Sequence, residues 1–225
     1  MKSILLPFCL IIFLITGCGK DDDTTPIPQE ETYVTTSANS TWNYQESDNI
    51  PPQSVTNYTV TSTDRDTTIN GKTYHIYNDS DGEERFLNVT GHDYYQYDSL
   101  PLGLGAGVFE RLYLKDDVAA GDTWVQNLTV DIPSLPIPIP LTITNTVAEK
   151  GISRTVNNIE YTNVIHISTR IASVLIPVAS LNTNISSYYA PKFGLIENSN
   201  VVALDYLGVT ANINVQTKLL SADLK

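Results

Sequence analysis

The chain has 225 residues and a formal net charge of −12, with 13 lysine and arginine residues against 25 acidic ones. Affinity for nucleic acid comes mainly from neutralised phosphates, so this charge balance, without a cluster of basic residues, excludes a nucleic-acid-binding function. The length suffices for one domain with a sizeable buried core.

The N-terminus has the pattern of a secretory signal peptide. Lys2 supplies a positive charge, and a mostly apolar run follows over residues 4–15. That run is too short to span a bilayer, which takes about 20 apolar residues. Its length is typical of the central region of a signal peptide, and two small residues separate it from Cys18. We predict that residues 1–17 are a cleaved signal peptide.

The sequence Leu14-Ile15-Thr16-Gly17-Cys18 resembles the lipobox of bacterial lipoproteins. In that family the cysteine thiol is acylated, the chain is cleaved before the cysteine, and the new amine is acylated too, with palmitate among the acyl chains. The resemblance implies that the lipoprotein-processing machinery lipidates Cys18 and that the acyl chains hold the protein on a membrane. The alternative is an ordinary secretory peptide that contains a cysteine by chance.

A lysine and three acids, Lys20, Asp21, Asp22 and Asp23, follow the cysteine. They resemble the surface-export signal of Bacteroidota lipoproteins, which implies that export machinery routes the protein to the outside of the outer membrane. The alternative is a solvated linker. We interpret residues 18–31 as a lipidated, flexible acidic linker and residues 32–225 as a single β domain.

The rest of the chain alternates apolar and polar residues with a period of two, as half-buried strands do. The pairs Asn70-Gly71 and Asp81-Gly82 are typical of hairpin turns, and no segment shows a helical stripe. We predict an all-β fold of roughly ten to thirteen antiparallel strands, with the sheet curved into an open barrel or a sandwich. The clearest inward-facing series are Trp124, Leu128, Val130, Ile132; Ile139, Leu141, Ile143, Val147; Tyr161, Ile165, Ile167, Ile171; and Ala211, Ile213, Val215, Leu219.

A weak internal repeat lies within these strands. Residues 58–74 align without gaps on residues 145–161, with identities that include Asn70 with Asn157 and Tyr74 with Tyr161. The match predicts a domain built from two repeated halves, and shared hairpin chemistry is the alternative explanation.

Aromatic motifs flank the repeat. Trp42 and Tyr44 precede it, and the sequence Tyr188-Tyr189-Ala190-Pro191-Lys192-Phe193-Gly194-Leu195-Ile196 follows it. This arrangement looks like that of an all-β family of Bacteroidota lipoproteins, and the resemblance implies no particular activity. The resemblance implies a curved antiparallel sheet of the half-barrel kind that carries lipoproteins or lipids.

The sequence contains no recognisable catalytic or metal-binding motif. His75, His92 and His166 lack the spacing of metal ligands, and His166 is interpreted as a solvated residue on the polar face of its strand. The acidic stretch 78–84 lacks the closing glutamate of a calcium loop and is interpreted as a hairpin turn. We therefore predict no catalytic residue, no metal and no cofactor.

Three segments are more apolar than connecting segments usually are: residues 100–109, 132–141 and 171–181. Either they cover the core, or they line an apolar cavity or meet a partner. We predict a non-catalytic, surface-exposed lipoprotein that binds an apolar ligand, a glycan or a partner protein. The alternative is an extracellular hydrolase of a glycan or another polymer, for which a pocket should bring together two carboxylates or a buried histidine.

Overall fold

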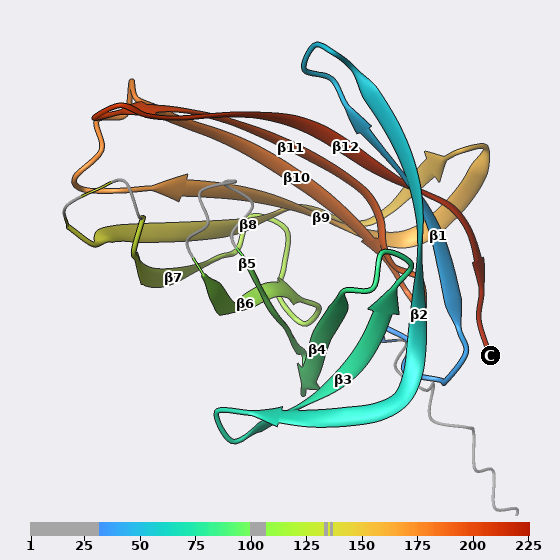
Figure 1. The fold of residues 1–225 in the computed structure, drawn as a ribbon. Coiled ribbons are helices and arrows are strands. Elements are labelled where there is room, and N and C mark those ends of the chain that lie inside the picture. Colours follow the sequence, from blue (N-terminus) through green and yellow to red (C-terminus); the bar gives the residue numbers. More distant parts are fainter. Residues whose placement is uncertain (1–31, 100–106, 133–134, 136) are drawn as a thin grey trace, which may run out of the picture. The chain divides into compact units, whose positions relative to one another are not determined.

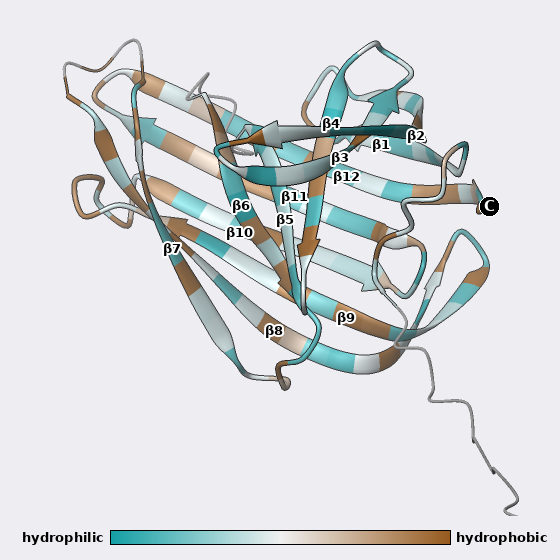
Figure 2. Ribbon diagram, turned by 90° about the horizontal axis from the view of Figure 1, so that it is seen from below, coloured by the Kyte–Doolittle hydropathy of each residue, from teal (hydrophilic) through white to brown (hydrophobic). Residues whose placement is uncertain are grey.

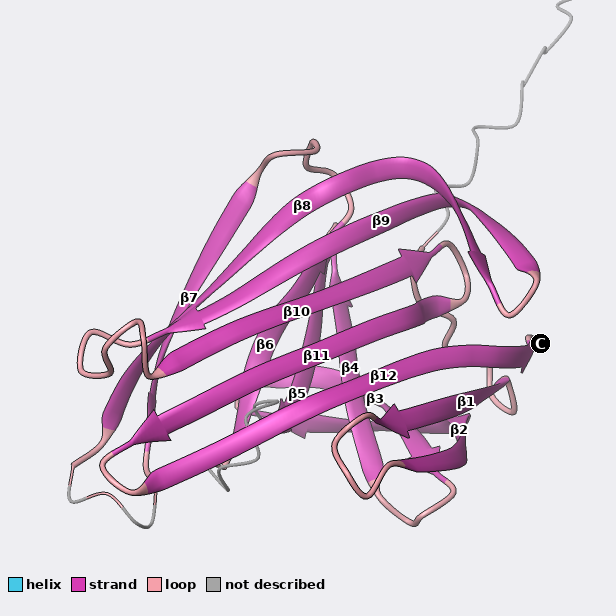
Figure 3. Cartoon of the chain, turned by 90° about the horizontal axis from the view of Figure 1, so that it is seen from above, coloured by secondary structure: helices cyan, strands magenta, loops and turns pink. Residues whose placement is uncertain are grey.

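The computed structural model describes residues 32–99, 107–132, 135 and 137–225, which form one antiparallel sheet of twelve strands and contain no helix (Figure 3). In this described part there is accordingly no helix long and apolar enough to cross a membrane. The strands are β1 (Thr41–Asp48), β2 (Ser54–Ile69), β3 (Lys72–Asp79), β4 (Glu84–Thr90), β5 (Asp93–Ser99), β6 (Val108–Lys115), β7 (Thr123–Val130), β8 (Ile139–Val156), β9 (Ile159–Ala172), β10 (Leu181–Ala190), β11 (Gly194–Tyr206) and β12 (Val209–Asp223).

The strands follow one another around a nearly closed barrel. Their order in the sheet is β6-β5-β4-β3-β2-β1-β12-β11-β10-β9-β8-β7, so each strand pairs with its neighbour in the sequence and β1 pairs with β12. The sheet curves until its two edge strands, β6 and β7, approach each other (Figure 1). This confirms the predicted all-β fold and selects the barrel rather than the sandwich.

Alternating side chains explain which face of the sheet is buried. Val147 on β8 and Ile167 on β9 are cross-strand partners, and both are buried in the same apolar cluster. His166, one position away, contacts Glu149 and Ser186 on the opposite face. Figure 2 shows this alternation as bands of apolar and polar residues along β8 to β12. The predicted period-two series on these strands are therefore confirmed.

The two segments of the weak repeat occupy equivalent places in the sheet. The hairpin β2–β3 lies six strands from the hairpin β8–β9 in chain order. Asn70 and Asn157, with φ of 52° and 49°, each begin the tight turn of their hairpin, where the left-handed conformation favours Asn or Gly. Tyr74 and Tyr161 are both buried. Turn chemistry accounts for the matching asparagines, and a duplication of six strands stays a prediction.

One end of the barrel is filled by aliphatic side chains from the connections between strands. Ile132 and Ile176, in the β7–β8 and β9–β10 connections, are buried in a cluster with Ile139, Ile171 and Leu181. The buried residues of the apolar segments 132–141 and 171–181 therefore cover the core, as one of the two interpretations predicted. Other apolar residues of the two segments are exposed: Ile137, Val174, Leu175 and Val178. Most of the segment 100–109 lies outside the described residues.

The chain just before β1 packs at the opposite end. The backbone N–H of Tyr33 donates to the hydroxyl of Tyr94 at 3.1 Å, and its own hydroxyl donates to the carbonyl oxygen of Asn163 at 2.7 Å. Gly194 has a φ of 69°, and a Cβ there would lie 3.3 Å from the carbonyl oxygen of Tyr33. Glycine at this position thus adopts the positive φ that the turn requires and leaves room for the backbone of Tyr33.

The barrel stays open between β6 and β7, where side chains take the place of a strand ladder. The indole Nε1 of Trp124 donates to the carbonyl oxygen of Leu112 at 2.8 Å. The carboxamide of Gln126 accepts from the N–H of Leu112 at 3.4 Å and donates to the carbonyl oxygen of Glu110. Gln126 therefore bonds to β6 as a peptide group of a neighbouring strand would, which protects two edge strands that could otherwise pair with other chains.

Replacing Gln126 with Ala is expected to lower the free energy of unfolding by about 1–3 kcal/mol, since backbone groups of Leu112 and Glu110 lose their partner. Urea unfolding measures the loss, and hydrogen exchange at the Leu112 amide should accelerate. Gln45→Ala is the matched control, because the side chain of Gln45 makes a 3.5 Å contact with that of Asn57. An equal loss in both variants would contradict a role for Gln126 in closing the barrel.

Candidate functional site

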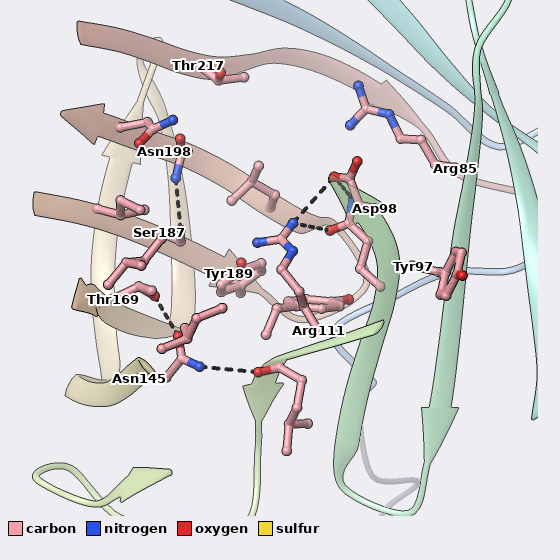
Figure 4. A pocket seen from close by; sticks show the side chains of 18 of the residues that line it. Arg85, Tyr97, Asp98, Arg111, Asn145, Thr169, Ser187, Tyr189, Asn198 and Thr217 are labelled. Carbon is pink, nitrogen blue, oxygen red and sulfur yellow. Dashed lines mark hydrogen bonds and ion pairs between the residues drawn. The ribbon is translucent and has the colours of Figure 1, made fainter. Parts of the chain in front are cut away.

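A cavity of about 350 Å³ lies inside the barrel, and residues from all twelve strands line it (Figure 4). Its volume falls within the range of about 300–1,000 Å³ that is typical of small-molecule sites. A second cavity of about 110 Å³, lined largely by aromatic and aliphatic side chains, lies below that range. The larger cavity is the candidate functional site.

Seven polar side chains on seven consecutive strands line this cavity, and we call them the polar belt. They interrupt inner faces that are otherwise apolar, with Ile143 and Ile171 among the lining residues beside them. The belt consists of Arg111 on β6, Gln126 on β7, Asn145 on β8, Thr169 on β9, Ser187 on β10, Asn198 on β11 and Thr217 on β12.

Hydrogen bonds between neighbouring strands orient several members of the belt. Thr169 donates to the carboxamide oxygen of Asn145 at 2.6 Å, and the same carboxamide donates to the carbonyl oxygen of Leu112 at 3.3 Å. Asn198 donates to the hydroxyl of Ser187 at 2.9 Å. Asn145 and Ser187 are buried, so these polar groups are costly unless hydrogen-bonded. These side chains are therefore preorganised to bond to a polar group in the cavity.

Charged side chains from the other strands complete the lining. The Nε and Nη2 of Arg85 both donate to Oδ2 of Asp79, at 2.8 and 2.6 Å. Burial raises the pKa of the Asp79 carboxyl, and the Arg85 guanidinium opposes that rise. Arg111 makes a longer ion pair, with its Nη2 at 3.4 Å from Oδ2 of Asp98.

The polar belt was missed in the sequence, although a signal for it is present. The predicted inward-facing series on β7, β8 and β12 each skip one period-two position, and the series on β9 skips two. Four of the five skipped positions are members of the belt: Gln126, Asn145, Thr169 and Thr217. The fifth, Asn163, does not line the cavity. Each gap by itself is an ordinary irregularity of a strand.

The predicted lipidation and export residues, Cys18, Lys20, Asp21, Asp22 and Asp23, lie outside the described residues. Their roles stay predictions.

Two of the three histidines belong to Ser–His–carboxylate groups that resemble the triads of hydrolases. His75 contacts Ser62 through Nε2 at 2.9 Å and Asp66 through Nδ1 at 2.8 Å. Ser62, however, is 1% exposed, and its hydroxyl donates to the carbonyl oxygen of Thr36 at 3.1 Å. A buried hydroxyl whose proton is directed to a carbonyl is not activated for attack on a substrate. We interpret this group as a structural connection between β2, β3 and the chain before β1.

His166 forms the second group, on the outer face of the barrel. Its Nε2 lies 2.6 Å from the Ser186 hydroxyl, its Nδ1 lies 3.0 Å from Glu149, and its ring stacks on Tyr188 at 4.2 Å. The side chain is 16% exposed, so the prediction of a solvated residue is wrong: neighbouring strands cover it. The backbone N–H groups of paired strands point along the sheet, away from the face that carries Ser186, and so cannot form an oxyanion hole above it.

His92 contacts Asp116 at 2.6 Å, near the opposite end of the barrel from the Ile176 cluster. In the described part of the chain, no three His, Cys, Asp or Glu side chains gather closely enough to hold a metal ion.

No protein-family model and no curated protein matches the chain. Solved structures similar to it include a candidate lipoprotein from Parabacteroides distasonis, with 9% identity and a TM-score of 0.47, covering 86% of this chain and 99% of that one. Another is a candidate exported protein with a YmcC-like fold from Bacteroides fragilis, with 7% identity, a TM-score of 0.47 and the same coverage. These identities and TM-scores are too low to transfer a function to this chain.

Proposed function

We propose that the protein is a lipid-anchored binding protein of the outer membrane, facing the cell exterior, whose barrel holds a small hydroxyl-rich ligand such as a mono- or disaccharide. The anchor and the location rest on the lipobox-like sequence at Cys18 and on the acids that follow it. The observation that carries the binding function is the 350 Å³ cavity lined by the polar belt.

The lining favours a polar ligand over the apolar ligand considered from the sequence. The carboxamide of Asn145 has two N–H donors and two acceptor lone pairs, and its bonds to Leu112 and Thr169 use one of each. An apolar molecule in the cavity would displace water from such remaining donors and acceptors and offer no hydrogen bonds in return. Each group left unsatisfied costs about 1–3 kcal/mol. Sugar hydroxyls both donate and accept, which matches side chains of both kinds. Tyr113 and Tyr189, whose ring centroids lie 5.4 Å apart, also line the cavity and supply aromatic surface for the apolar side of a sugar.

Replacing Thr217 with Val is expected to weaken ligand binding about 3- to 10-fold, which corresponds to one hydrogen bond of about 0.5–1.5 kcal/mol. Thr217 is buried and lines the cavity, and Val has nearly the same shape, so the fold should persist. Thr210→Val, an exposed position on the same strand, is the matched control. Binding is measured by calorimetry, with mono- and disaccharides as probes, on lipoprotein purified from membranes in a detergent without a sugar head group.

Mass spectrometry of small molecules that copurify with the lipoprotein provides an independent test. A bound saccharide would support the proposal. A copurified lipid, or a protein that carries no small molecule and binds no saccharide probe, would overturn it.

A further inference from the structure

Arg111 reaches into the cavity from β6 with much of its hydrogen-bonding capacity unused (Figure 4). Both described hydrogen bonds of its guanidinium are made by Nη2, to Gln96 at 3.5 Å and to Asp98 at 3.4 Å. These are long, because N–H···O bonds in proteins cluster near about 2.9–3.0 Å. Its Nε is buried and has no hydrogen-bond partner among the residues that the structure describes. A guanidinium carries five N–H donors, so this one can donate hydrogen bonds to a further partner.

The other arginine of the cavity, Arg85, shows what a satisfied guanidinium looks like in the same barrel. Its Nε and Nη2 are both held by Asp79 at 2.8 and 2.6 Å. Both arginines line the same cavity, so they differ in their hydrogen-bond partners and not in their location. Arg111 has no carboxylate in a short, two-bond contact.

The remaining acids that line the cavity do not neutralise Arg111 at short range. Asp98 is its nearest carboxylate and is itself 44% exposed. Glu46, Glu83 and Glu84 are exposed, and Glu84 forms its ion pair with Arg65 at 2.8 Å. Exposed charges interact weakly across water, whereas a largely covered cation without a close partner is costly. The side chain of Arg111 is 22% exposed.

We propose that Arg111 binds a carboxylate of the ligand, and hence that the ligand is a hydroxyl-rich acid such as a uronic acid. A carboxylate matches the planar fork of a guanidinium and would give its Nη groups shorter bonds than the long ones to Gln96 and Asp98. Figure 4 shows Arg111 and Asp98 on one side of the cavity and Ser187, Asn198 and Thr169 on the other. The acid group of the ligand would lie against Arg111 and its hydroxyls against the amides and hydroxyls of the polar belt. This inference rests on the proposed binding function.

Matched pairs of sugars test it: D-glucose with D-glucuronate, and D-galactose with D-galacturonate, titrated calorimetrically into the full lipoprotein. We expect the acid of at least one pair to bind about tenfold more tightly than its neutral partner. Arg111→Gln should abolish that preference, so that the acid and its neutral partner bind the variant with equal affinity. Arg111→Lys should keep part of the preference, because lysine retains the charge but not the fork. Arg170→Gln, an exposed arginine on β9, is the matched control and should keep the whole preference.

The outcomes separate this inference from the proposed function. Equal affinity for acid and neutral sugars, unchanged in Arg111→Gln, would overturn the role of Arg111 and leave saccharide binding intact. Binding of neither kind of sugar would overturn both. If circular dichroism shows that Arg111→Gln does not fold, NMR of the unaltered protein provides the test instead. The Nε–H resonance of Arg111 should then shift on addition of the uronate and not on addition of the neutral sugar. A resonance that stays in place with the uronate would contradict the contact.

Discussion

Replacing Cys18 with Ala is expected to move the protein from the membrane fraction to the soluble fraction of lysed cells. Each buried methylene of an acyl chain contributes about 0.8 kcal/mol, so several chains hold a protein essentially permanently and their loss releases it. Immunoblots of the two fractions measure the change. Cys9→Ala is the matched control, because Cys9 lies within the predicted signal peptide and should leave with it. A Cys18→Ala variant that stays in the membrane fraction would contradict lipidation at this residue.

A triple replacement of Asp21, Asp22 and Asp23 with Ala separates anchoring from surface export. The variant should stay in the membrane fraction, because Cys18 is intact, but become resistant to protease added to whole cells. Unchanged sensitivity to protease would show that the three acids are only a solvated linker.

Raising the pH above about 10 is expected to unfold the protein cooperatively, because buried tyrosines cannot ionise in the folded state. Six buried tyrosines have a pKa above the ordinary value of 10.0, and desolvation by burial is the largest cause in each: Tyr44, Tyr74, Tyr77, Tyr94, Tyr161 and Tyr189. Below pH 10 the tyrosines keep their protons in both the folded and the unfolded chain, so they do not lower the free energy of unfolding. Above pH 10 the unfolded chain loses them and the folded chain does not, so the free energy of unfolding falls.

This loss of free energy is large enough to unfold the protein. One tyrosine removes about 1.4 kcal/mol per pH unit, and six together remove on the order of 8 kcal/mol, against a total stability of about 5–15 kcal/mol. Tyrosinate absorbance and circular dichroism, followed together during an alkaline titration, should change in one transition. Gradual ionisation with unchanged circular dichroism would contradict the prediction.

Tyr113→Phe provides a matched variant for the alkaline titration. Burial raises the pKa of the Tyr113 hydroxyl well above 10.0, and no hydrogen bond of this hydroxyl is described. Phe keeps the ring and removes the titrating group, so the stability of the variant should fall less steeply with pH, by about 1.4 kcal/mol per unit.

Much of the fold could be predicted from local patterns. The alternation in the series Ile139, Leu141 and Ile143 predicted a strand with one buried face, and all three residues are buried on β8. The pair Asn70-Gly71 predicted a hairpin and forms one between β2 and β3. These predictions succeeded because side chains alternate across any strand and because few residues adopt positive φ, whatever the rest of the chain does.

The closure of the barrel could not be predicted in the same way. β1 pairs with β12, which is separated from it by almost the whole domain, and Gln126 bonds to β6 with a side chain. The alternation of side chains within a strand does not reveal which other strand it pairs with, because the backbone N–H and C=O groups that form the pairing are the same in every residue. The contact of Ser62 with His75 likewise depends on an irregular register between β2 and β3.

The sequence by itself determined the all-β architecture, the inward face of four of the strands and the lipobox-like motif at Cys18, because each is a property of neighbouring residues. Only the tertiary structure decided that the gaps at Gln126, Asn145, Thr169 and Thr217 line a single cavity. A polar residue in one apolar series is an irregularity, and its meaning depends on the register of the strands beside it. That register places Asn145 opposite Thr169 and Asn198 opposite Thr217, so that separate irregularities line one cavity, where we propose that a polar ligand binds.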